Sequence, residues 1–167
     1  RMIDAALHMA EGKPDTSEEI LRDIIAANPT FAAATTQLYI QLLRTGRQGD
    51  AREVLTAALQ ANDSAPRLLL LQAGELEREG DIEGAIAIYE ALYSRNTNNI
   101  IVANNLASLL SAFRDDEESQ DRAAAVARRL RGTEVPAFQD TYGWITYKQG
   151  NFEEALTYLE PAAEALA

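Results

Sequence analysis

The chain has 167 residues, no cysteine, one histidine and a net charge of -11. The lack of cysteine excludes disulfide scaffolds and thiolate metal sites, and a single histidine excludes a two-histidine metal site. The excess of 26 acidic over 15 basic residues argues against nucleic acid as a partner, because binding along the phosphate backbone needs clustered Lys and Arg. No segment approaches the roughly 18 consecutive apolar residues of a membrane span, so we expect no transmembrane segment.

The first segment, residues 1–31, predicts two short helices joined at Gly12. Glycine adopts the left-handed conformation that ends a helix sharply, and Asn28-Pro29 stops the second helix because the residue before proline disfavours helix. His8 is expected to pack on the inner face of the first helix. The chain begins inside this helical pattern, so we expect it to be a piece of a longer protein.

Residues 32–65 and 66–99 repeat the same order of features. Gly46 and Gly80 each follow the preceding turn glycine by 34 residues. Small residues recur in register and let paired helices approach closely: Ala5, Ala73, Ala107 and Gly143 in first helices, and Ser17, Ala51, Ala85 and Ala155 in second helices. Pro66 is expected to open a helix, while Glu75, Glu77 and Glu79 are interpreted as a solvated helix face.

Residues 100–135 depart from this order, because Arg114 stands where the glycine is expected and an acidic run follows at 115–121. We expect a turn longer by about four residues, then a helix from about 119 to 131, with Ala123, Ala127 and Leu130 facing inward. The run lacks the alternating ligands and central glycine of an EF-hand loop, so we interpret it as a solvated acidic turn.

Residues 136–167 form the last repeat, opened by Pro136 with a turn at Gly150. Pro161 should kink or shorten its second helix. Four apolar residues are then expected to lie exposed at this end: Leu156, Leu159, Ala162 and Leu166. Either a longer chain or a second copy of the protein, in a homo-oligomer, would cover them.

The 34-residue helix-turn-helix unit resembles the tetratricopeptide repeat (TPR). The resemblance covers the whole chain and implies an all-α, right-handed α-solenoid. We expect this solenoid to be a single domain of five repeats, at about 1–31, 32–65, 66–99, 100–135 and 136–167. The alternative is an unrelated antiparallel helical bundle, which has no reason to keep this period.

The resemblance also implies a non-catalytic module that binds a protein or peptide, because the first helices of such repeats line a concave groove. The sequence contains no glycine-rich phosphate loop and no metal-binding motif, so we expect no cofactor and no metal. The groove positions carried over from the family are Thr36, Ile40, Leu43, Arg44, Arg67, Leu70, Glu77, Arg78, Asn104, Ser108, Ser111, Asp140, Trp144, Tyr147 and Lys148. Trp144 is either a binding anchor or a residue packed between helices. Thr36 and Ile40 stand where family members that hold chaperone tails carry Lys and Asn, so we do not expect that specificity.

The last repeat also resembles a more restricted group of proteins within this family. The run Asp140-Thr141-Tyr142-Gly143-Trp144, with Gly150 and Glu154-Ala155-Leu156, resembles bacterial TPR proteins associated with exopolysaccharide export, including the PEP-CTERM-linked type. This likeness implies a bacterial source and leaves the compartment open between the cytoplasm and the periplasm or cell envelope. It supplies the alternative function, a structural subunit of an envelope or exopolysaccharide-export complex.

Overall fold

The computed structural model describes residues 1–166, and every regular element among them is helical. The helices are α1 (Met2–Ala10), α2 (Pro14–Ala27), α3 (Ala32–Arg44), α4 (Gln48–Ala61), α5 (Pro66–Glu79), α6 (Ile82–Arg95), α7 (Ile100–Phe113), α8 (Glu117–Ala127), the 3-10 turn η1 (Arg128–Leu130), α9 (Pro136–Lys148) and α10 (Phe152–Leu166). The predicted helix starts at Pro66 and Pro136 are confirmed, as is the end of α2 before Asn28-Pro29.

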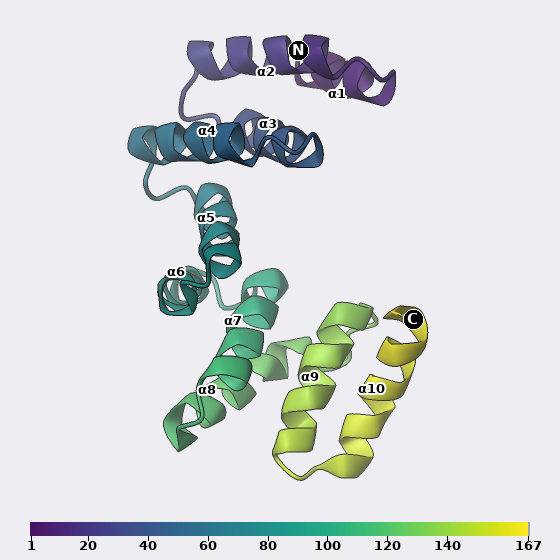
Figure 1. Cartoon of the computed structure of the whole chain (residues 1–167). Helices are drawn as coiled ribbons and strands as arrows, with labels where there is room; N and C mark the ends of the chain where they lie inside the picture. Colours follow the sequence, from purple (N-terminus) through teal and green to yellow (C-terminus); the bar gives the residue numbers. More distant parts are fainter. Residues whose placement is uncertain (167) are drawn as a thin grey trace. The chain divides into compact units, whose positions relative to one another are not determined.

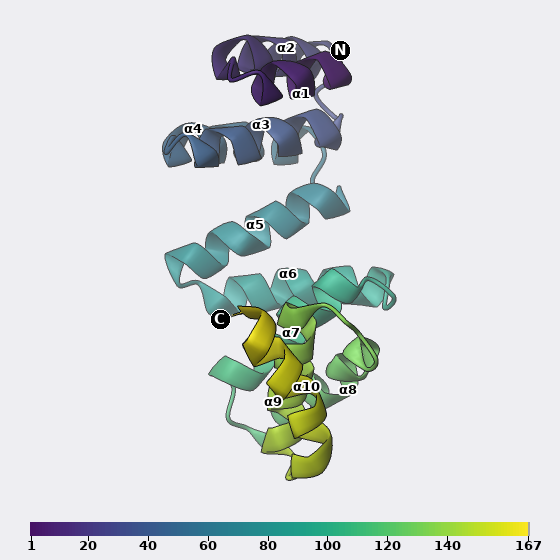
Figure 2. The ribbon, with the colours of Figure 1, turned by 90° about the vertical axis from the view of Figure 1, so that its right-hand side faces the viewer.

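The helices fall into two compact units, and the boundary between them lies within α5. Unit 1 is Arg1–Glu75 and unit 2 is Leu76–Ala167. In unit 1, α1 packs beside α2 and α3 beside α4 (Figure 1). In unit 2, α7 packs beside α8 and α9 beside α10, and the turned view keeps α9 next to α10 (Figure 2). In each of these four pairs, a turn of three residues joins the two helices.

The predicted glycine turns are confirmed. Gly12, Gly46, Gly80 and Gly150 all have φ between 74° and 82°. At Gly46 the backbone N–H bonds to the carbonyl of Leu43 at 3.1 Å, and the next N–H, of Arg47, bonds to Leu42 at 2.9 Å. These two bonds satisfy carbonyls that the end of α3 leaves open, and they require the left-handed conformation that glycine adopts without a steric penalty.

The predicted small residues at the helix crossings are confirmed as buried, and Gly143 shows why size matters there. A Cβ atom built on Gly143 would lie 2.7 Å from Cγ of Leu159 and 3.2 Å from the carbonyl oxygen of Ala155. Both partners belong to α10. The absence of a side chain at Gly143 therefore sets how closely α9 and α10 approach.

The prediction of a lengthened turn after α7 is wrong. Only Arg114–Asp116 separate α7 from α8, the same three-residue length as the turns after α1, α3 and α9. The Asp116 carboxylate accepts a hydrogen bond from the Ser119 N–H at 2.8 Å, and this capping bond lowers the pKa of Asp116. Because Asp116 starts a helix, most of the acidic run forms its first turns. Ala123, Ala127 and Leu130 are buried as predicted.

A side chain replaces the missing glycine at the end of α7. Arg114 is extended, with φ -120° and ψ 124°, and its N–H bonds to Leu110. The Gln120 side-chain amide donates to the carbonyl oxygens of Leu110, Ser111 and Arg114. Gln120 thus satisfies the C-terminal carbonyls that a glycine turn satisfies with backbone N–H groups.

The prediction that Pro161 shortens the last helix is wrong. Helix α10 continues through Pro161 to Leu166, and Pro161 lies on its exposed side, where water can satisfy the carbonyl group that proline leaves without a donor. Of the four apolar residues predicted to be exposed, Leu156 and Leu166 are exposed, Leu159 is half-buried and Ala162 is buried. Ala162 lies inward because the uninterrupted helix keeps it on the same face as Ala155.

Candidate functional site

Unit 1 has an open apolar cleft formed by first helices. It has a volume of about 280 Å³ and is lined by Met2, Met9, Ala33, Thr36, Gln37, Ile40, Gln41, Arg44 and Arg67. Helices α1, α3 and the start of α5 contribute these residues. Four of the predicted groove residues therefore meet in one cleft: Thr36, Ile40, Arg44 and Arg67. The Ile40 side chain is 40% exposed, so the apolar floor is accessible to a ligand.

Two arginines at this cleft are free to bind anions. Arg44 lies in the last turn of α3 and Arg67 in the first turn of α5, and both are exposed. Within residues 1–166 neither guanidinium makes an ion pair or a hydrogen bond. By contrast, Arg47, which lies outside the cleft, forms ion pairs with Glu18 and Asp50. The cleft thus combines an apolar floor with two uncompensated positive charges.

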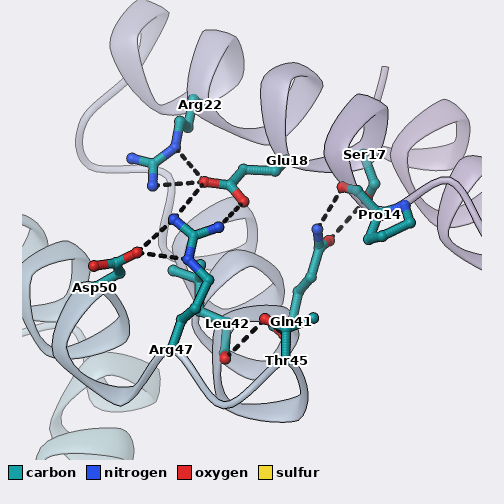
Figure 3. Close-up of polar contacts among 9 residues, drawn as sticks. All are labelled: Pro14, Ser17, Glu18, Arg22, Gln41, Leu42, Thr45, Arg47 and Asp50. Carbon is teal, nitrogen blue, oxygen red and sulfur yellow. Dashed lines mark hydrogen bonds and ion pairs between the residues drawn. The ribbon is translucent and has the colours of Figure 1, made fainter.

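A buried amide connects the first two helix pairs under this cleft. Gln41 on α3 is 4% exposed and accepts a hydrogen bond from the Ser17 hydroxyl at 2.9 Å. Its amide nitrogen donates to the carbonyl oxygen of Pro14 at 2.7 Å (Figure 3). These bonds join α3 to α2 and fix the helix that carries Ile40 and Arg44.

Glu75 occupies the same repeat position as Gln41, 34 residues later, and the prediction that it is solvated is wrong. Glu75 is 7% exposed. The Tyr39 hydroxyl donates to its carboxylate, and a guanidinium nitrogen of Arg52 lies 3.5 Å from it. The burial is possible because Tyr39 and Arg52, from the preceding helix pair, supply partners for the charge.

The outer side of unit 1 carries an ion-pair cluster around Glu18. Arg22 and Arg47 both donate to the Glu18 carboxylate, and Arg47 also binds Asp50 (Figure 3). Burial opposes ionisation of Glu18, but the hydrogen bonds from the two arginines outweigh it and lower its pKa. The cluster joins α2 to the start of α4.

In unit 2 the predicted polar groove residues are only partly accessible. Asn104 on α7 is half-buried and Ser108 is exposed, but Ser111 is 3% exposed. The Lys148 ammonium group on α9 reaches α7 and donates to the carbonyl oxygen of Ser111 at 2.7 Å. Ser111 therefore does not present its hydroxyl on an open surface, contrary to the prediction, because α7 is buried around most of its circumference.

An aromatic cluster, Trp144, Tyr147 and Phe152, lies at the turn between α9 and α10. The Trp144 and Tyr147 rings are stacked, with centroids 5.5 Å apart, and the Phe152 ring lies 5.3 Å from Tyr147. Trp144 is 51% exposed. The sequence prediction did not include Phe152, although its position two residues after Gly150 places it beside the end of α9.

The remaining predicted groove residues differ in how far their side chains are exposed to solvent. Leu43 and Leu70 are half-buried, and Arg78 and Asp140 are exposed. Glu77 accepts a hydrogen bond from the Tyr89 hydroxyl at 2.6 Å. Burial of Tyr89 and its bond to Glu77 raise the pKa of the Tyr89 hydroxyl. Glu77 thus links α5 to α6, and its side chain is half-buried.

Among the described residues, the side chains that could serve in catalysis or metal binding do not lie together in one site. His8 is half-buried, and its Nδ1 atom lies 3.5 Å from the Glu11 carboxylate without a hydrogen bond. Among residues 1–166, no three His, Asp or Glu residues are grouped so that they could hold a metal ion. No helix in the same range has the length and apolar character needed to cross a membrane.

Comparison with known proteins identifies the fold. No protein-family profile matches the sequence, and no curated protein matches it significantly. Solved structures do match. MamA is 15% identical with a TM-score of 0.67, over 96% of this chain and 92% of that one. PilF of Pseudomonas aeruginosa is 17% identical with a TM-score of 0.74, over 98% of this chain and 73% of that one.

A tetratricopeptide repeat protein from Parabacteroides merdae is also similar, at 17% identity and a TM-score of 0.63. The match covers 98% of this chain and 63% of the Parabacteroides chain. At these identities the likeness establishes the fold, which is an α-solenoid of TPR-type helix pairs. The predicted fold class is therefore confirmed.

Proposed function

We propose that this chain is a non-catalytic protein-interaction module and that the cleft on α1, α3 and α5 of unit 1 binds a segment of a partner protein. The observation that carries the proposal is the pairing of an apolar floor at Met2, Met9 and Ile40 with the unpaired Arg44 and Arg67. The TPR-type fold of MamA and PilF supports the general class, a protein-interaction scaffold.

The cleft favours a segment that carries both carboxylates and apolar side chains. Guanidinium groups bind carboxylates through paired hydrogen bonds, and two such groups flank the floor at Arg44 and Arg67. The half-exposed Ile40 and the methionines accept aliphatic side chains, since Met adapts to irregular apolar surfaces. An acidic segment with interspersed Leu, Ile or Met is therefore the ligand that this surface complements.

A peptide-display selection on the full chain tests this specificity. Short random peptides that bind the protein are expected to be enriched in Asp and Glu beside aliphatic residues. Arg44→Gln with Arg67→Gln should weaken a selected peptide about tenfold or more, because charge-assisted hydrogen bonds each contribute about 1.5–3 kcal/mol. The matched control, Arg128→Gln with Arg129→Gln, removes the same charge from exposed residues of unit 2. Equal losses in both variants would contradict the proposal.

In unit 2 we propose Trp144 as a second anchor for a partner, because half of its surface is exposed and Tyr147 holds its ring by stacking. Trp144→Ala should then weaken binding of that partner while changing the free energy of unfolding little. A variant that fails to fold would instead identify Trp144 as a packing residue.

A second candidate function is a structural subunit of a larger bacterial assembly, such as an envelope or exopolysaccharide-export complex. The exposed apolar residues Phe152, Leu156 and Leu166 on α10 favour this candidate, because such side chains become buried in permanent interfaces. Sedimentation equilibrium tests whether copies of this chain provide that interface. A concentration-dependent dimer that Leu156→Glu dissociates would support it, and a strict monomer would exclude self-association.

A further inference from the structure

We propose that a second cleft, between α6 and α8 in unit 2, binds a basic segment of a partner protein. The cleft has a volume of about 740 Å³, well above that of the unit 1 cleft. It is lined by Ile86, Glu90, Leu110, Arg114, Asp116, Glu118, Ser119, Asp121, Arg122 and Ala125. All ten of these residues lie on α6, α7, α8 or the turn between α7 and α8, and none belongs to the predicted groove.

The floor of this cleft is apolar. Ile86 of α6 and Leu110 of α7 line it but are only 6% and 4% exposed, and Ala125 of α8 is half-buried. The apolar surface that a bound segment can cover here is therefore small, and the ion pairs at the rim determine which segment binds. A ligand without apolar side chains would leave this apolar surface in contact with water, so the surface would contribute nothing to the free energy of binding.

Both arginines at the cleft are already neutralised. Arg114 is paired with Glu83, and Arg122 is paired with Glu90 at 2.7 Å. The Arg122 guanidinium also lies 5.3 Å from the centroid of the Tyr93 ring. These two ion pairs connect α6 to the end of α7 and to α8, so they brace the cleft and leave little positive charge for a ligand.

The carboxylates of α8 are not neutralised. Asp116 is used as the helix cap, but Glu118 and Asp121 are exposed and have neither an ion pair nor a hydrogen bond in the described part of the chain. These two groups leave the rim with a net negative charge.

The cation that fits this rim is a basic side chain. The carboxylates are not grouped closely enough to hold a metal ion, as far as residues 1–166 are concerned. Lys and Arg instead reach separate carboxylates through long flexible stems, and those stems cover apolar surface. A helical or extended segment that carries Lys or Arg beside Leu or Ile therefore matches both the rim and the floor. This preference is opposite in charge to that proposed for unit 1, so the two proposals can fail independently.

Fluorescence anisotropy with two labelled peptides tests the proposal on the full chain. One peptide is an amphipathic helix of Leu and Lys, and the other replaces every Lys by Glu. The Lys peptide should bind, and Glu118→Gln with Asp121→Asn should weaken it about fivefold to tenfold, since each lost ion pair at an exposed site costs a small factor. The matched control, Glu53→Gln with Asp63→Asn, removes the same charge from exposed residues of unit 1 and should leave binding unchanged.

Three results would overturn the proposal. The Lys peptide could fail to bind, the two double variants could weaken it equally, or the Glu peptide could bind as tightly in competition at the same site. Circular dichroism of each variant checks that the helices are intact, and Arg44→Gln with Arg67→Gln should not affect binding of the Lys peptide.

Discussion

The close approach of α9 and α10 at Gly143 makes a quantitative prediction. At Gly143, the missing side chain lets α10 approach α9, and a methyl group placed there would meet Leu159 at 2.7 Å and the Ala155 carbonyl at 3.2 Å. The substitution Gly143→Ala introduces that methyl group. Leu159 is half-buried and can rotate, but the Ala155 carbonyl belongs to the backbone of α10 and must shift with the helix.

Two effects of opposite sign determine the result. Overpacking a tight contact costs about 1–3 kcal/mol. Replacing glycine by alanine inside a helix contributes about 1 kcal/mol of stability. We therefore expect Gly143→Ala to lower the free energy of unfolding by about 1 kcal/mol.

Gly74→Ala is the matched control. Gly74 also lies inside a first helix, α5, but a Cβ atom there would have no neighbour within 4 Å. Only the gain in helix propensity remains, so Gly74→Ala should stabilise by about 0.5–1 kcal/mol. Urea denaturation followed by far-ultraviolet circular dichroism measures both. If Gly143→Ala stabilises the protein as much as Gly74→Ala does, the close approach of α9 and α10 is wrong.

Three further predictions concern polar contacts. In a double-mutant cycle of Gln41→Ala and Ser17→Ala, urea denaturation should give a coupling energy of about 0.5–1.5 kcal/mol, and additive losses would exclude their hydrogen bond. Because the pKa of Tyr89 is raised in the folded state, its contribution to stability is complete below pH about 10 and is lost as the pH rises further. Wild-type stability should therefore fall more steeply above that pH than that of Tyr89→Phe, and parallel pH profiles from urea denaturation would contradict this. Asn99→Ala removes the cap that accepts from the Val102 N–H and should lower the thermal midpoint by the equivalent of about 1 kcal/mol; an unchanged midpoint would show that the cap contributes nothing.

The sequence predicted what depends on local geometry. Gly46 ends a helix because of its own backbone preference, and Ala73 and Ala107 are buried because a small residue is needed wherever paired helices cross. These requirements recur in every repeat, so a period of 34 residues reveals them without any alignment. The same regularity placed Ile40, Arg44 and Arg67 on one face.

What the sequence did not predict depends on neighbouring repeats. A glutamate such as Glu75 on an amphipathic helix normally indicates a solvated face, and only the partners Tyr39 and Arg52 make its burial possible. One signal was present, since Gln41 and Glu75 occupy the same position in consecutive repeats. The replacement of a turn glycine by the Gln120 amide has no comparable signal, because that side chain lies on the following helix.

The central claim, that the first-helix face of unit 1 binds a partner segment, is tested most directly by mapping where a ligand binds. Amide chemical shifts in a ¹H–¹⁵N spectrum of the full chain can be followed while a peptide selected by display is added. Binding at the proposed cleft predicts that the largest changes fall on residues 33–44 of α3 and on Arg67, with little change on α4. Changes confined to α2 and α4, or the same changes in Arg44→Gln with Arg67→Gln at unaltered affinity, would contradict it.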